Sequence, residues 1–159
     1  MENQPISQPK QKVSHKFSKK LLLLTVAGGA AFWAATILTS ILPVAASYRA
    51  AFSNWSIQTV WVASLPMGLV IGCCVSFLLL KLTAKKPIVK PLLKAIIISA
   101  IVLIAAVLLI DVPMFLKTPN GSLHYFFVGV LFNTARFLIL GATIGFLYKG
   151  FLLSRDNQK

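Results

Sequence analysis

Four long apolar segments constrain the fold of this chain more than any other feature. They cover residues 21–46, 59–80, 95–116 and 125–148, and each exceeds the roughly 20 helical residues that cross a bilayer core. The segments do not alternate with period two, as the strands of a membrane β-barrel would. The chain is 57% hydrophobic and 12% charged, whereas soluble domains carry about 25% charged residues. We therefore predict an all-α membrane protein with four transmembrane helices.

The connections between these segments are short, so consecutive helices are expected to run antiparallel as an up-down bundle. Pro87 and Pro91 interrupt helix between the second and third segments. We predict one transmembrane domain over residues 21–148, preceded by a basic tail over 1–20 and followed by a short tail over 149–159.

The basic residues are distributed unequally along the chain. Thirteen of the 16 fall on one predicted side of the bundle: Lys10, Lys12, Lys16, Lys19, Lys20, Lys81, Lys85, Lys86, Lys90, Lys94, Lys149, Arg155 and Lys159. Arg49 and Lys117 fall on the other side, and Arg136 lies within a span. Because Lys and Arg are enriched in cytoplasmic loops, this distribution predicts that both termini are cytoplasmic and that the protein lies in the cytoplasmic membrane.

A cleaved signal peptide is the main alternative for residues 21–46. The sequence Val44-Ala45-Ala46 resembles a cleavage site for small residues. The apolar run before it is much longer than the roughly 7–15 residues of a signal peptide, so we favour an uncleaved helix.

Asp111 and Arg136 are ionisable residues inside predicted spans, where such groups are costly and usually paired. At 1.5 Å per residue, Asp111 should lie roughly 7 Å and Arg136 roughly 16 Å below the outer boundary. A long Arg side chain reaching outward closes much of this difference. We predict that the two residues interact directly, through Asn133 or through a water.

Two interpretations of this pair remain open. In the structural one, which we favour, it fixes how the last two helices pack. In the functional one, it belongs to an outward-facing polar pocket that receives an anion or carries a proton. Four further residues at similar depth or on the same helix face would line such a pocket: Ser64, Pro66, His124 and Thr143. Pro66 should also free the carbonyl of Val62 for another donor.

Small residues at helical spacing predict close helix packing. Gly68 and Gly72 form one GxxxG motif, and Gly141 and Gly145 form another. We favour packing within the bundle, with homodimerisation as the alternative.

The basic segment from Lys10 to Lys20 has two interpretations. As an interfacial helix it would contact anionic lipid head groups through Lys12, Lys16, Lys19 and Lys20. As a disordered topology determinant, which we favour, it would need only its charge.

The sequence lacks the residues that several classes of function require. The three carboxylates are Glu2, Asp111 and Asp156, too few for paired acid–base catalysis. Cys73 and Cys74 have no further Cys or nearby His for a metal site, and we predict no catalytic residues, metal or cofactor. No nucleic-acid recognition motif accompanies the basic charge, so we expect no such partner. Asn54-Trp55-Ser56 and Asn120-Gly121-Ser122 match the glycosylation sequon, which chance explains as well.

The expected partners are the bilayer and either a second copy of the chain or another membrane protein. The favoured function is a non-enzymatic accessory, assembly or sensing component that acts through helix packing and contacts with lipid or partners. The alternative is a small transporter or channel subunit with a pocket around Asp111, Asn133 and Arg136.

Overall fold

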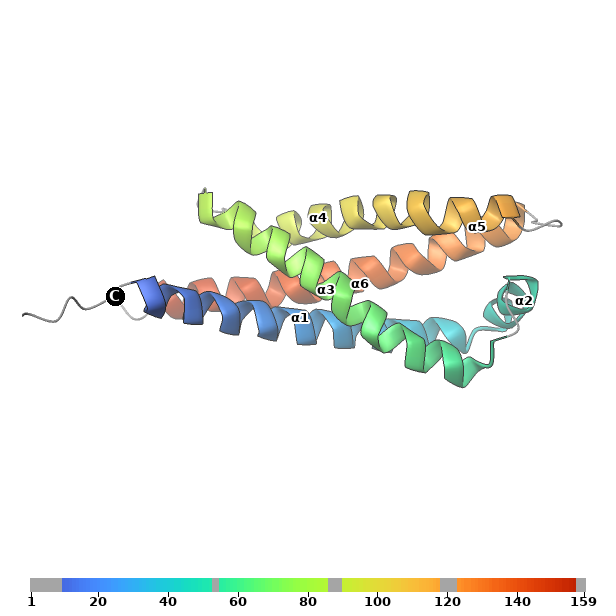
Figure 1. Ribbon diagram of the computed structural model, residues 1–159, viewed down its shortest axis with the longest axis horizontal. Helices are drawn as coiled ribbons and strands as arrows, with labels where there is room; N and C mark the ends of the chain where they lie inside the picture. Colours follow the sequence, from blue (N-terminus) through green and yellow to red (C-terminus); the bar gives the residue numbers. More distant parts are fainter. Residues whose placement is uncertain (1–9, 53–54, 86–89, 118–122, 157–159) are drawn as a thin grey trace, which may run out of the picture.

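The computed structural model describes residues 10–52, 55–85, 90–117 and 123–156, and within these ranges every element is helical (Figure 1). The α-helices are α1 (Lys10–Ser40), α2 (Pro43–Phe52), α3 (Ile57–Lys85), α4 (Pro91–Ala106), α5 (Val112–Lys117) and α6 (Leu123–Asp156), and a π-helix, η1 (Val107–Asp111), joins α4 to α5. The predicted all-helical class is confirmed for this part of the chain.

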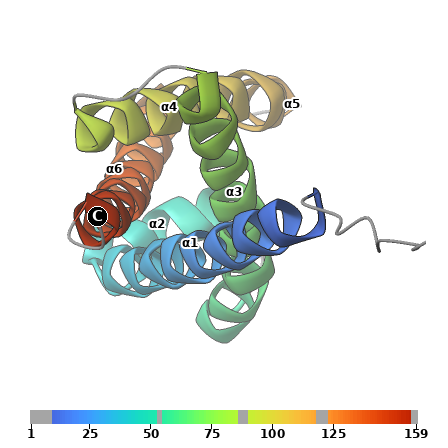
Figure 2. The same ribbon diagram turned by 90° about the vertical axis from the view of Figure 1, so that its left-hand side faces the viewer.

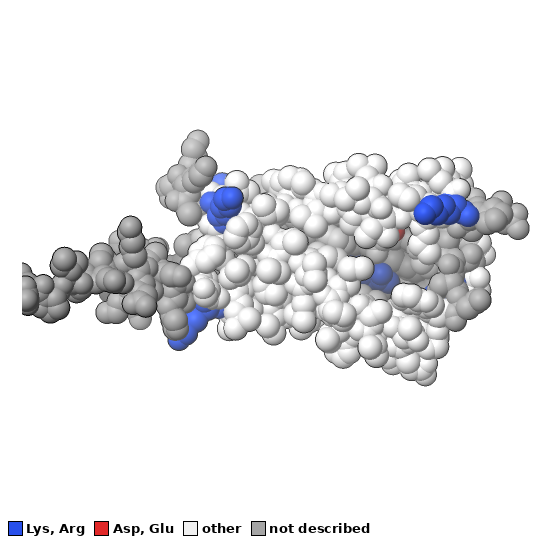
Figure 3. Space-filling model, in the orientation of Figure 1, with Lys and Arg blue, Asp and Glu red and all other residues white. Residues whose placement is uncertain are grey.

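Four helical spans are long and apolar enough to cross a membrane: Phe17–Ser40, Ile57–Thr83, Pro91–Lys117 and Leu123–Leu153. The third is α4, η1 and α5 in continuous sequence. Large apolar side chains on these spans face outward, including Val62, Leu109 and Leu116, which are 74%, 76% and 75% exposed. Figure 3 shows a wide uncharged band between two ends that carry basic residues. This distribution suits a molecule surrounded by lipid.

The prediction for the first helix is wrong at its carboxyl end. The expected helix over 21–46 ends as α1 at Ser40, and residues 43–52 form the separate helix α2 in place of a loop. Pro43 is the cause, because its ring nitrogen cannot donate to the carbonyl of Thr39 and its ring disfavours helix at the preceding residue. Proline is well suited to the first position of the new helix.

The basic segment at the start of the chain is also helical. α1 begins at Lys10, so the favoured interpretation of residues 10–20 as disordered is wrong for this segment. The Nζ atom of Lys20 lies 5.6 Å from the centroid of the Phe151 ring on α6, a cation–π contact, while Lys19 is exposed. Residues 1–9, as well as Asn54 and residues 120–122 of the two sequons, lie outside the described residues.

The helices form two close pairs that meet through α1 and α6. α1 packs mainly on α3, and α4 packs mainly on α6. Figures 1 and 2 show α3 crossing α1 obliquely, so that its end at Lys85 lies near α4 and its start lies far from α5. α1 begins and α6 ends at one end of the molecule, whereas α2 and α5 lie at the other, here called the α2 end.

Both GxxxG motifs lie at these close pairs. A Cβ at Gly72 would come within 2.9 Å of the Thr25 carbonyl oxygen and 3.1 Å of the Gly29 nitrogen, both on α1. A Cβ at Gly145 would lie 2.9 Å from Cα of Leu92 on α4. The glycines therefore serve packing within the chain, as the favoured interpretation expected, and these faces are not free for a second copy.

We predict that Gly72→Ala destabilises the protein, whereas Gly150→Ala does not. The new methyl group at residue 72 would meet backbone atoms that cannot rotate away, at a cost of about 1–3 kcal/mol. Gly150 has no atom within 4 Å of its Cβ position, so alanine there should only improve helix propensity. Thermal unfolding in detergent measures both effects, and equal midpoints for the two variants would contradict this account of α1–α3 packing.

Candidate functional site

A chain of hydrogen bonds joins the third and fourth spans to α1 near the α2 end. The Asn133 amide Nδ2 donates to Asp111 Oδ2 over 3.0 Å, and Arg136 Nη1 donates to Asn133 Oδ1 over 3.3 Å. Arg136 also donates from Nε and Nη2 to Thr39 Oγ1, over 3.2 and 3.0 Å. The structure thus links Asp111 to Arg136 through Asn133, and it adds Thr39, which the sequence analysis missed.

The end of α1 explains why Arg136 is held there. Thr39 Oγ1 donates in turn to the Thr36 carbonyl oxygen over 3.1 Å, and Arg49 Nη1 donates to the Ser40 carbonyl oxygen over 3.2 Å. The last carbonyl groups of a helix lack partners within it and carry partial negative charge. Two guanidinium groups therefore lie where the α1 dipole favours cations.

Two tryptophans fasten α3 to the same part of α1. Trp61 Nε1 donates to Ser40 Oγ over 2.7 Å, and Trp33 Nε1 donates to the Trp61 carbonyl oxygen over 2.9 Å. The predicted release of the Val62 carbonyl by Pro66 stays a prediction; the Trp33 donor bonds to the carbonyl of the preceding residue, Trp61. The α1 carboxyl end is thus the point at which α2, α3 and α6 are all joined to α1.

The π-helix η1 determines which way Asp111 faces. Partly or fully buried positions of the third span recur at 95, 99, 102–103, 106–107 and 111, so its inward face continues through η1. Within η1, the Val112 nitrogen donates to the Val107 carbonyl, five residues back. Pro113 lacks a backbone donor, which favours such a break in the regular pattern. Ile110, the residue before Asp111, is 52% exposed.

Asp111 ends this π-helix, is partly buried and accepts a hydrogen bond from Asn133 on α6. Without the extra residue of the π-helix, the helix face would be rotated by about 100°, one residue of an α-helix. π-Bulges are frequent at functional sites.

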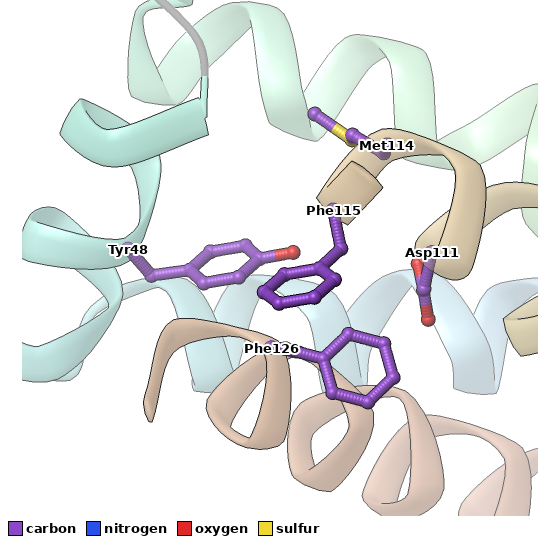
Figure 4. A pocket seen from close by; sticks show the side chains of 6 residues that line it. Tyr48, Asp111, Met114, Phe115 and Phe126 are labelled. Carbon is purple, nitrogen blue, oxygen red and sulfur yellow. The ribbon is translucent and has the colours of Figure 1, made fainter. Parts of the chain in front are cut away.

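A small cavity adjoins Asp111. It has a volume of about 10 Å³ and is lined by Tyr48, Asp111, Met114, Phe115, Phe126 and Gly129 (Figure 4). This is about the space that one water molecule needs. Figure 3 shows a recess toward the α2 end, with basic atoms in it and acidic atoms at its edge.

Tyr48 closes one wall of the cavity from α2. Its ring stacks edge-on against Phe132, with 6.3 Å between the centroids, and a Cβ at Gly129 would lie 2.7 Å from its hydroxyl oxygen. Glycine at 129 therefore makes room for Tyr48 against α6. Burial, followed by the negative charge of Asp111, raises the pKa of Tyr48, so its hydroxyl remains a protonated donor at neutral pH.

The other predicted pocket residues do not line this cavity. Pro66 and His124 are exposed, and the hydroxyl groups of Ser64 and Thr143 donate to carbonyl groups of their own helices, those of Trp61 and Ile139. Asn133 and Arg136 belong to the hydrogen-bonded chain but not to the cavity lining. Among the residues predicted to line a pocket, this cavity is lined by Asp111 alone.

The residues that sequence reasoning missed are Thr39, Tyr48, Met114, Phe115, Phe126 and Gly129. Tyr48 and Phe126 are aromatic residues in apolar surroundings, and no local pattern separates them from lipid-facing residues. One available signal was Pro113, two residues after the charged Asp111 within a span.

Cys73 and Cys74 are free and exposed on α3. Among the described residues, no group of three or more His, Cys, Asp or Glu side chains is arranged to hold a metal ion.

Comparisons of the chain with models of protein families, with curated proteins and with solved structures find no match. The site must therefore be interpreted from its own chemistry.

We predict that Thr39→Val destabilises the protein by about 1–3 kcal/mol, because the Arg136 guanidinium loses the acceptor of two of its donors in a largely apolar setting. Thr143→Val is the matched control. That hydroxyl bonds only within its own helix, over 2.8 Å to the Ile139 carbonyl, and its loss should cost less. Unfolding in detergent measures both, and a control as destabilised as Thr39→Val would refute the role given to Thr39.

Deletion of one residue should be tolerated in η1 but not in α4. Removing Leu109, which is 76% exposed, restores a step of four between Ala106 and Asp111 and keeps the inward face of the helix. Removing Ile101, which is 59% exposed, rotates one half of the span against the other by about 100°. Folded yield and thermal midpoint compare the two deletions, and equal losses would argue against η1 as an inserted residue.

Proposed function

We propose that this protein is a non-enzymatic component of the cytoplasmic membrane with four transmembrane helices, serving as an accessory, assembly or sensing subunit. In this proposal its helices form an antiparallel up-down bundle with both termini in the cytoplasm. It would act through contacts of its apolar helix faces with lipid and with a membrane protein partner or a second copy.

The orientation is supported by charge and by the position of the ends. α1 begins and α6 ends at the same end of the molecule (Figure 1), and Figure 3 shows basic side chains at this end. Lysines and arginines near the ends of spans favour the cytoplasmic side. The four spans then alternate in direction. In this proposal Lys12, Lys16, Lys19 and Lys20 would contact anionic head groups on this side.

One observation carries the accessory role: the polar groups in the membrane-spanning part are bonded to one another. Arg136 donates to Thr39 and Asn133, and Asn133 donates to Asp111. Groups used in this way fix the relative positions of α1, α6 and the third span. Because these polar groups form hydrogen bonds inside the protein, the outward faces of the spans are largely apolar and suited to packing against other helices.

The absence of enzymatic activity is part of the proposal and is supported by composition. Asp111 is the single carboxylate of the spans, and its partner Asn133 does not titrate. A carboxylate pair, as acid–base catalysis at two carboxylates needs, is therefore absent from the described spans.

A small transporter or channel subunit is the second candidate, and the cavity beside Asp111 is the observation that favours it. A water-filled route from the α2 end to Arg136 is what would distinguish transport from a scaffold. A transporter of this size would also be expected to assemble as an oligomer.

We predict that the full-length protein, purified from its native membranes in mild detergent, carries one membrane protein partner in near-stoichiometric amount. Quantitative mass spectrometry of the purified complex measures the ratio, and light scattering gives its mass. A multipass protein with the same affinity tag, purified from the same membranes, is the control. A strictly monomeric protein free of partners would contradict both the accessory role and the transporter alternative.

A further inference from the structure

The cavity beside Asp111 combines a carboxylate with aromatic walls. The rings of Phe115 and Phe126 lie 5.3 Å apart between centroids, and Tyr48 points toward them from α2 with its hydroxyl end foremost (Figure 4). Aromatic faces attract cations through the ring quadrupole, most strongly where water is excluded. Such walls around one negative charge are typical of sites for organic and ammonium cations.

The carboxylate has an oxygen available to a ligand. Asn133 donates to Oδ2, whereas no hydrogen bond from the described residues reaches Oδ1. Asp111 therefore places a carboxylate with an open oxygen at the wall of the cavity.

Arg136 does not neutralise this charge by direct contact. Its Nε and Nη2 donors are directed to Thr39, at the end of α1, where the helix dipole already favours a cation. Asn133 separates its Nη1 from Asp111. The guanidinium is thus held by α1, and Asp111 remains able to attract a second cation.

The lining indicates the class of that cation. Hard metal ions such as Ca²⁺ take six or more oxygen ligands, whereas the side chains of this cavity contribute a carboxylate and one phenol. An ammonium ion is close in size to water, donates hydrogen bonds to a carboxylate and is attracted to aromatic faces. The volume of about 10 Å³ admits an ion of this size but not a quaternary amine.

We propose that the cavity lined by Tyr48, Asp111, Phe115 and Phe126 is a binding site for a water-sized monovalent cation of the ammonium class. Asp111 Oδ1 accepts a hydrogen bond from the ion, and the aromatic rings cover its other sides. The site goes beyond the accessory role proposed above and does not depend on it.

Thermal unfolding of the full-length protein in detergent tests the site. The probe is ammonium chloride at constant ionic strength, with choline chloride as the balancing salt. We expect the midpoint to rise and saturate with ammonium, and to change much less with sodium or with tetramethylammonium chloride. An identical response to ammonium and sodium, or an equal response to tetramethylammonium, would overturn the proposal without any variant being needed.

Variants localise the effect. Asp111→Asn should weaken the apparent affinity for ammonium at least about tenfold, since it removes the charge that binds the ion. Phe126→Leu keeps an apolar wall but removes one aromatic face, and should weaken binding about fivefold, the loss expected for one cation–π contact. It also tests the site if Asp111→Asn does not fold.

Asp156→Asn is the matched control. It removes the other carboxylate of α6 and the third span, at the far end of α6 from Asp111, and should respond as the unmodified protein does. Ammonium binding that survives Asp111→Asn, or that is lost equally in Asp156→Asn, would place the ion elsewhere and refute the proposed site.

Discussion

The guanidinium of Arg136 is the constraint on which the arrangement at the α2 end depends. A cation within a membrane span must find acceptors inside the protein. Here Thr39 and Asn133 provide them, and both are positioned by other contacts: Thr39 by the end of α1, and Asn133 by its bond to Asp111. The hydrogen bonds that satisfy this one charge therefore fix the positions of three spans relative to one another. The break in the first apolar segment is part of this arrangement, because ending α1 at Ser40 directs its carboxyl end toward both Arg136 and Arg49.

Close packing holds one part of the bundle together, and hydrogen bonds between helices hold the other part. In the middle of the molecule and toward the end where α1 begins, glycines bring α1 against α3 and α4 against α6. In those regions the helices are held by contacts among apolar side chains such as Leu24, Leu79 and Ile144. Toward the α2 end, α3 diverges from α5, and hydrogen bonds to Thr39, Ser40 and Trp61 maintain the contacts (Figure 1). A cavity is accordingly found at the α2 end, where side chains do not fill the space between η1, α2 and α6.

The predicted interaction of Asp111 and Arg136 illustrates what sequence reasoning reaches and where it stops. Depth within the bilayer and the short connection between the last two spans brought the two residues near each other, and Asn133 was among the expected links. The lining of the cavity was beyond reach, because it depends on how helices rotate. A residue such as His124 lies at a suitable depth but faces outward, whereas Phe126, two positions later, faces inward. The depth of a residue in the membrane follows from counting residues along its helix. The direction in which its side chain faces depends on contacts with residues that are distant in sequence.

The sequence by itself determined the all-helical class and the number of membrane-capable spans, because continuous apolar runs of this length leave the backbone no other way to satisfy its hydrogen bonds in lipid. It also identified the glycines that would pack, since small residues at helical spacing are local information. The tertiary structure decided which residues form the site. Pro43 starts a second helix from which Tyr48 reaches Gly129, and Asp111 at the end of η1 bonds to Asn133 of α6. Both outcomes depend on which side chains of separate helices meet, and contacts between those helices decide this.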